Sequence, residues 1–142
     1  MDQLVEFIGN HPLMSGAWFA LFAMLVYSYI SSAVSPIKQV TTHDATMLIN
    51  KQDAVVLDIR PAADFKKGHI LGAKQIKPEQ LNQGEFGTLE KSKDKPIIVV
   101  CAMGMTAKRT AAQMLKAGFD NVSVLKGGMG EWQNASLPVV KK

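Results

Sequence analysis

Cys101, the only cysteine in the 142-residue chain, is the residue whose type and position most clearly suggest chemistry. It follows the apolar run PIIVV (96–100) and precedes Gly104 and a helical pattern that starts near Thr106. A cysteine there is either a buried, inert thiol or a nucleophile in a loop that opens onto a helix. Loop N–H groups and the helix dipole would stabilise a thiolate and an anion bound against its sulfur. Position alone does not decide between the two interpretations.

Other kinds of chemistry find little support in the composition. One cysteine excludes an internal disulfide and a two-cysteine redox pair within the chain. The three histidines, His11, His43 and His69, are widely spaced, so we predict no metal site, no cofactor and no Cys–His pair. The net charge is +4, but the lysines are scattered and no aromatic residues alternate with them. This pattern predicts a solvated basic face rather than a nucleic-acid site.

Three apolar runs are typical of buried strands that would position Cys101. They are residues 54–59 (AVVLDI), 96–100 (PIIVV) and 122–125 (VSVL). Between the last two, apolar residues at helical spacing predict a helix over 106–117, with Gly118 as its C-cap. Strands that alternate with helices over about 100 residues indicate an α/β domain with a parallel sheet and helices on both faces. Ligands of such sheets collect at the carboxyl ends of the strands, where Cys101 falls.

The remaining segments give weaker signals, but each has a local pattern that suggests an assignment. We predict a helix at 43–50 with Thr42 as N-cap, a helical turn from Pro61 to Phe65 that Gly68 stops, and a weak strand at 73–76. A helical turn from Pro78 and a polar surface loop at 82–95 follow. The Gly127-Gly128 turn is predicted to lead into a short helix in which Trp132 caps the core.

The N-terminal part of the chain has a different character. Residues 13–34 contain no charged side chain and would form a helix about 33 Å long, enough to cross a hydrocarbon core of about 30 Å. A cleaved signal peptide is less favoured because no Lys or Arg precedes the run, and a buried core helix rarely stays uncharged for so long. Lys38 and Lys51 lie on its C-terminal side. The chain is therefore predicted to be a single-pass protein of the inner (cytoplasmic) membrane, with its N-terminus outside and its soluble domain in the cytoplasm.

These patterns divide the chain into four parts. We predict a tail at 1–12, a transmembrane helix at 13–34, a linker at 35–41 and an α/β domain at 42–140. All 16 Lys and Arg lie from residue 38 onward, together with 10 of the 12 Asp and Glu, so residues 38–142 carry a net charge of +6.

Residues 42–140 resemble the rhodanese homology domain. The resemblance rests on VVLDIRPAADFKKGHILGAKQI (55–76), PIIVVCAMGMTAKRTAAQMLKAGFDNV (96–122) and LKGGMGEW (125–132). It implies that Cys101 takes a sulfane sulfur from a small donor such as thiosulfate or from a protein persulfide, carries it as a persulfide, and passes it to a nucleophilic acceptor. The loop that holds the persulfide would consist of Ala102, Met103, Gly104, Met105, Thr106 and Ala107.

The resemblance also suggests roles for charged residues around this loop. Asp58 and Arg60 would tie the edge of the sheet to neighbouring loops by hydrogen bonds, rather than act as an acid–base pair. Lys108 and Arg109 lie on the first turn of the predicted helix. They could supply charge at the rim of the loop, although a solvated face is the favoured interpretation.

The loop departs from the family's common Cys-x-x-Gly-x-Arg-Ser pattern. Thr106 stands where that arginine would be, and Met103 and Met105 make the mouth apolar. We therefore expect weak turnover of thiosulfate and a preference for a protein-borne or less charged sulfur partner. A phosphatase of the related Cys-x5-Arg type is excluded because Ala107 occupies the position of its phosphate-binding arginine.

A different class of function stays open. The chain could be a tethered interaction module whose rhodanese fold has lost efficient catalysis and whose span binds other membrane proteins, for example a translocation or insertion component. Gly16 and Ala20 form a small-residue pair that would allow close lateral packing of helices, although this spacing is common by chance. An enzyme needs a reactive thiol and a persulfide, whereas a scaffold needs neither.

Overall fold

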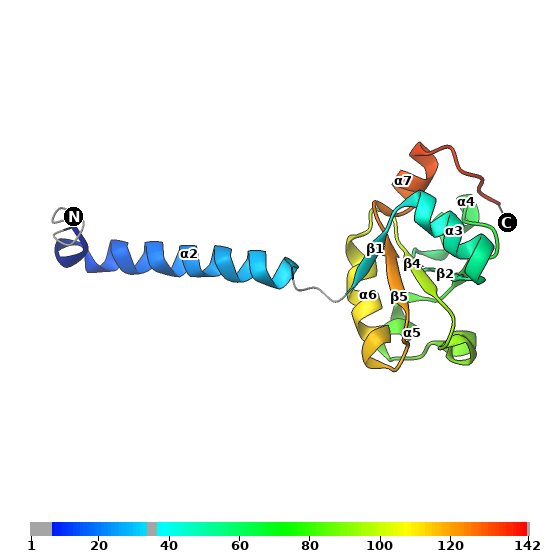
Figure 1. The fold of residues 1–142 in the computed structure, drawn as a ribbon, viewed down its shortest axis with the longest axis horizontal. Helices are drawn as coiled ribbons and strands as arrows, with labels where there is room; N and C mark the ends of the chain where they lie inside the picture. Colours follow the sequence, from blue (N-terminus) through cyan, green and yellow to red (C-terminus); the bar gives the residue numbers. More distant parts are fainter. Residues whose placement is uncertain (1–6, 34–36, 142) are drawn as a thin grey trace. The chain divides into compact units, whose positions relative to one another are not determined.

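The computed structural model describes residues 7–33 and 37–141, which fall into two compact units, Met1–Ser35 and Pro36–Lys142. Residues 7–10 are helical. The other elements, in chain order, are α2 (Pro12–Ala33), β1 (Lys38–Val40), α3 (Thr42–Gln52), β2 (Val55–Asp58), α4 (Ala62–Lys67), β3 (Lys74–Gln75), α5 (Pro78–Asn82), the 3-10 helix η1 (Gly87–Ser92), β4 (Ile97–Val100), α6 (Met105–Lys116), β5 (Val122–Leu125) and α7 (Gly128–Asn134) (Figure 1).

The first unit consists mainly of α2, which covers almost all of the predicted 13–34 helix. Its segment Pro12–Ile30 is long and apolar enough to cross a membrane. Most of the large apolar side chains along it are exposed, including Leu13, Trp18 and Tyr29. By length and composition this helix fits either a membrane span or a signal sequence. The predicted end of the helix at Ser35-Pro36 lies outside the described residues.

The second unit contains a five-stranded sheet with the order β1-β5-β4-β2-β3, in which every pair of neighbouring strands is parallel. β4 is the central strand, and all four of its residues are buried. This explains the unbroken apolar run in the sequence, since a strand covered on both faces has no polar side. Register pairs Leu57 with Val99 and Val99 with Val124, so the three strongest strands lie side by side.

Helices cover both faces of the sheet, as the sequence predicts. Successive residues of β4 point to opposite faces: Ile97 and Val99 pack with α5, η1 and α6, whereas Ile98 and Val100 pack with α3 and α7. Two apolar cores result, one on each side of the sheet. Trp132 is buried in the second core, and its indole N–H donates to the carbonyl of Pro138 at 3.1 Å.

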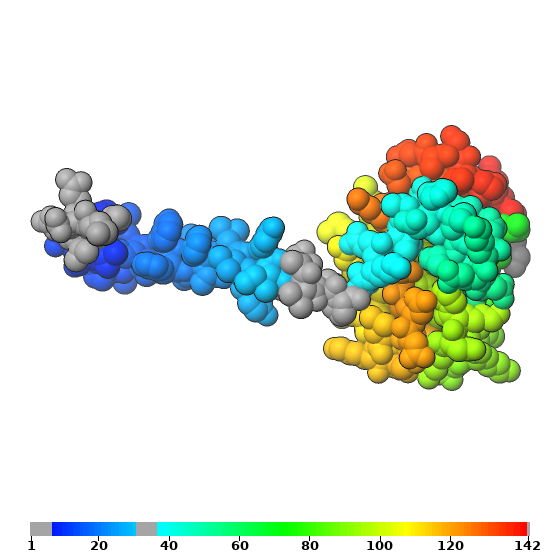
Figure 2. Space-filling view, viewed as in Figure 1, coloured from blue at the N-terminus to red at the C-terminus, as the bar shows by residue number. Residues whose placement is uncertain are grey.

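The predicted linker at 35–41 contains a strand. Residues 38–40 form β1, which pairs with β5 at the edge of the sheet. Figure 2 shows this cyan segment at the surface beside the yellow and orange segments that lead into β5. Three residues carry too little periodicity to indicate a strand, and β1 forms because the edge of β5 offers it hydrogen-bonding partners.

Three local predictions are wrong in detail. The N-cap of α3 is Thr41 and not Thr42, because the Thr41 hydroxyl accepts the N–H of Asp44 at 3.1 Å. The C-cap of α6 is Ala117; Gly118 comes one residue later with a positive φ of +93°. Residues 82–95 are more ordered than a polar surface loop, because they contain η1 and two buried side chains, Phe86 and Leu89.

Candidate active site

Cys101 lies at the carboxyl end of the central strand, immediately after β4. Its side chain is 6% exposed and belongs to the core on the α6 side of the sheet. The residues that follow turn sharply, and α6 begins at Met105. The thiol is therefore at the N-terminal end of a 12-residue helix, where the helix dipole favours negative charge.

The backbone N–H of Gly104 donates to the Cys101 Sγ at 2.9 Å. Gly104 makes this contact in the left-handed region, with φ of +89°, a conformation that glycine adopts without steric cost. A donor held against the sulfur stabilises a thiolate, and it would also stabilise a persulfide anion at the same position. The loop thus supplies a fixed positive dipole without using a charged side chain.

The N-terminal end of α7 holds the cysteine loop in place through backbone hydrogen bonds. The N–H of Met129 donates to the carbonyl of Cys101 at 2.9 Å, and the N–H of Gly130 donates to that of Ala102 at 3.1 Å. Gly128 makes this approach possible: it has φ of +59°, and a Cβ at this position would overlap the carbonyl oxygen of Cys101. The Gly127-Gly128 pair that stands out in the sequence therefore sets the position of the loop.

The residues predicted to form the persulfide-binding loop differ from one another in their exposure to solvent. Met103 and Met105 are 78% and 83% exposed, so two flexible thioethers flank the loop that carries the sulfur. Thr106 is exposed on the first turn of α6, whereas the side chain of Ala107 is fully buried in the core. The described residues contain no cluster of His, Cys, Asp or Glu that could hold a metal ion.

The sheet and the cysteine loop match a known protein family. The family model described as "Rhodanese-like domain" matches residues 41–135, which include the sheet, the cysteine loop and the Gly-Gly turn. The chain belongs to the rhodanese-like domain family.

Relatives and solved structures agree with this assignment. The chain is 43% identical to YibN of Escherichia coli, a protein described as uncharacterized, over 141 residues and 99% of both chains. It is 33% identical to the thiosulfate sulfurtransferase GlpE of Pseudoalteromonas translucida over 105 residues, which are 74% of this chain and 97% of that relative. A rhodanese-related protein from Thermoplasma volcanium has the same fold, with a TM-score of 0.63 at 23% identity over 74% of this chain and 99% of that one.

The Asp-x-Arg motif of this rhodanese-like domain forms a buried ion pair. Asp58 and Arg60 are 1% and 8% exposed, and an Arg60 guanidinium nitrogen lies 2.7 Å from an Asp58 carboxylate oxygen. The guanidinium also donates to the carbonyl of Gly68 at 2.7 Å. The side-chain amide of Gln75 donates to the Arg60 carbonyl at 3.0 Å. The motif therefore links the end of β2 to the loop after α4 and to β3, which is a structural role.

Removing one partner of this pair should destabilise the fold. In Arg60→Met the Asp58 carboxylate would stay buried without its counter-ion, so we expect a loss of about 3 kcal/mol in the free energy of unfolding. Lys67→Met is the matched control, because the Lys67–Asp64 pair is exposed at both ends; it should cost less than about 0.5 kcal/mol. Urea unfolding of the two variants checks this, and equal costs would show that the buried pair adds no stability.

His69 also has a structural role in the domain. Its ring stacks on Phe65 with centroids 3.8 Å apart, and its Nδ1 is 2.9 Å from the Phe65 carbonyl oxygen. Its backbone pairs with Val140 in an antiparallel bridge. These contacts fix the segment that leads to β3.

The ionisable groups with shifted pKa values, Asp53 and Lys95, lie away from the cysteine loop. The Lys95 ammonium donates a hydrogen bond of 2.6 Å to Asp53, and this bond lowers the pKa of the Asp53 carboxyl and raises the pKa of Lys95. Asp53 ends α3, and Lys95 precedes β4, so the pair lies at the end of β4 opposite Cys101. This exposed ion pair joins two surface segments and takes no part in the site.

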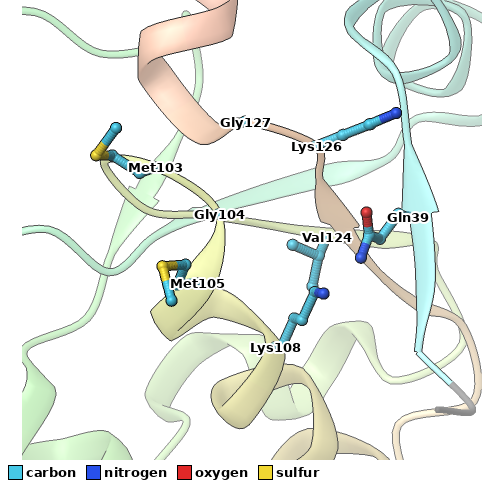
Figure 3. A pocket seen from close by; sticks show the side chains of 8 residues that line it. All are labelled: Gln39, Met103, Gly104, Met105, Lys108, Val124, Lys126 and Gly127. Atoms are coloured by element: carbon cyan, nitrogen blue, oxygen red, sulfur yellow. The ribbon is translucent and has the colours of Figure 1, made fainter. Parts of the chain in front are cut away.

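The first turns of α6 present cations on two sides. Lys108 lines a pocket of about 240 Å³ together with Met103 and Met105 (Figure 3). Arg109 lines a different pocket of about 220 Å³, which Thr106 shares. The sequence places Lys108 and Arg109 next to each other, but the helix separates the surfaces to which they contribute. No sequence pattern points to Lys126, which follows β5, or to Gln39 of β1, yet both also line the Lys108 pocket.

Proposed function

We propose that the chain is a membrane-anchored sulfurtransferase that carries sulfane sulfur as a persulfide on Cys101. The observation that carries this proposal is the Gly104 N–H at 2.9 Å from the Cys101 Sγ, in a loop at the carboxyl edge of the sheet and the start of α6. The relationship to GlpE, described as a thiosulfate sulfurtransferase, supports the same chemistry.

The proposed transfer has two steps. The Cys101 thiolate attacks the outer sulfur of thiosulfate; the sulfur–sulfur bond of the donor breaks and sulfite leaves with the electron pair. A new bond then joins the transferred sulfur to Sγ, and the Gly104 N–H stabilises the resulting negative charge. In the second step an acceptor nucleophile attacks the outer sulfur of the persulfide, and the Cys101 thiolate is restored.

Thr106 should limit the use of thiosulfate. Thiosulfate is a dianion, and the neutral Thr106 side chain supplies no charge at the start of α6 to attract it. Thr106→Arg is expected to raise kcat/KM for thiosulfate about tenfold, which corresponds to about 1.4 kcal/mol of added transition-state stabilisation. Thr106→Gln controls for side-chain length. Steady-state kinetics in which arginine gives no gain over glutamine would count against this role for charge.

The anchor is proposed to be α2. Its Pro12–Ile30 segment fits a membrane span by length and composition, and the positive charges begin at Lys38. We expect the full chain to stay in the membrane fraction after alkaline carbonate extraction, and a chain without residues 13–34 to be released. Protease added to spheroplasts should leave the α/β domain intact if this domain lies in the cytoplasm. Release of the full chain by carbonate would contradict the anchor, and cleavage in spheroplasts would contradict the orientation.

A further inference from the structure

Two lysines from different elements line one pocket beside the cysteine loop. Lys108 comes from α6 and Lys126 from the residue after β5, with Gln39 on the neighbouring strand β1 (Figure 3). Met103 and Met105 line the same pocket from the loop side. Two lysines, one glutamine and two methionines are thus among the residues that line this pocket of about 240 Å³.

One residue separates this pocket from the sulfur of Cys101. Gly104 lines the pocket, and its N–H is the donor to Sγ. Gly104 is also packed closely against the β5–α7 turn, because a Cβ on it would lie 3.2 Å from the Gly127 nitrogen. Lys126 is the first residue of that turn. A ligand held by the lysines would therefore lie next to the loop that carries the reactive sulfur.

The charges of the two lysines are available for a ligand. No salt bridge in the described part of the chain involves Lys108 or Lys126, and no Asp or Glu lines this pocket. Glu131 lines an adjacent pocket that Lys126 shares, without an ion pair between them. Two uncompensated ammonium groups around a small pocket favour a carboxylate or another anion.

The position of the charges indicates the size of that ligand. In thiosulfate the negative charge lies on the reacting outer sulfur itself and on oxygens only two bonds away from it, so its cation would have to lie within the loop. Here the lysines lie beyond Gly104, and exposed methionines flank the loop. A ligand that fits both has a carboxylate several bonds away from its sulfur, joined by a chain long enough to pass the flexible methionines.

We propose that the Lys108–Lys126 pocket binds the carboxylates of a low-molecular-weight thiol whose persulfide donates its outer sulfur to Cys101. This inference rests on the proposed sulfurtransferase function. The Cys101 thiolate attacks the outer sulfur of R–S–SH, the sulfur–sulfur bond of the donor breaks, and R–S⁻ leaves with the electron pair. Cys101 gains the sulfur together with its proton, so atoms and charge balance without any other reactant.

Glutathione persulfide is a suitable probe because it carries two carboxylates, and its diethyl ester is the matched probe without them. The full chain in detergent is mixed with each donor, and intact mass follows the loading of Cys101 over time. We expect Lys108→Gln and Lys126→Gln each to lower the second-order rate constant for glutathione persulfide about threefold, and the double variant about tenfold. Loading from the diester should not fall in any of these variants.

Lys116→Gln is the control for net charge, because Lys116 is an exposed lysine at the other end of α6. It should leave both rate constants unchanged. The proposal is overturned if Lys116→Gln slows loading as much as Lys108→Gln, or if the diester is slowed equally. A fall with Arg109→Gln and none with Lys108→Gln would also overturn it, since Arg109 lines the other pocket. Failure of the unmodified chain to load from any donor would instead reject the sulfurtransferase function itself.

Discussion

Cys101→Ser is expected to reduce the conversion of thiosulfate and cyanide to thiocyanate and sulfite by at least about 1,000-fold. The serine hydroxyl is a far weaker nucleophile than a thiolate and cannot carry sulfur as a persulfide. No other cysteine in the chain can take over the role. Thiocyanate formation by the full chain and by the variant measures the effect directly.

The serine variant should still fold, which keeps the kinetic result interpretable. Serine is smaller than cysteine, and its hydroxyl can accept the Gly104 N–H that now donates to Sγ. Thermal unfolding curves of the two proteins should therefore lie close together. Retention of more than a tenth of the turnover by a folded serine variant would mean that some other group activates the donor, and the persulfide mechanism would have to be abandoned.

Gly128→Ala is expected to have the largest effect on stability. The new methyl group would overlap the carbonyl oxygen of Cys101, and φ of +59° disfavours any residue with a Cβ. We expect a loss of about 4 kcal/mol or more in the free energy of unfolding, from backbone strain and from displacement of the loop. The same displacement should also lower sulfur transfer.

Gly72→Ala separates the two causes of that loss. Gly72 has a positive φ of +77°, but no atom lies within 4 Å of a Cβ built there. This control should cost only about 1–2 kcal/mol, the price of the left-handed conformation alone. Chemical denaturation of both variants provides the comparison. If Gly128→Ala cost no more than Gly72→Ala, the close packing of the Gly-Gly turn on the cysteine loop would not contribute to stability.

Much of the fold is predictable because its strongest signals are local. The apolar runs at 54–59, 96–100 and 122–125 contain β2, β4 and β5, since buried parallel strands need apolar side chains on both faces. The elements that escaped prediction depend on contacts far away in sequence. β1 has no pattern of its own and forms by pairing with β5, about 85 residues later. In the 82–95 segment Phe86 is buried against Phe119, which a local window cannot reveal.

The residues of the candidate site also fall into two groups, those that a local sequence pattern predicts and those that distant parts of the chain contribute. Cys101 and Gly104 are three positions apart and follow one strand, so their proximity can be predicted from the strand–loop–helix pattern. Gln39 belongs to β1, and Lys126 directly follows β5. Both residues line the same pocket as Lys108 because the sheet order places β1 next to β5, and α6 contacts β5. Spacing along the chain does not specify this arrangement.

The most direct test of the sulfur-carrier proposal is the intact mass of the full chain after incubation with thiosulfate, beside Cys101→Ser. A persulfide adds the mass of one sulfur atom, about 32 Da, and dithiothreitol should remove it. We predict this adduct on the unmodified chain and its absence from the serine variant. If neither thiosulfate nor a small persulfide donor produces the adduct, Cys101 is not a sulfur carrier, and the tethered interaction module becomes the hypothesis to pursue.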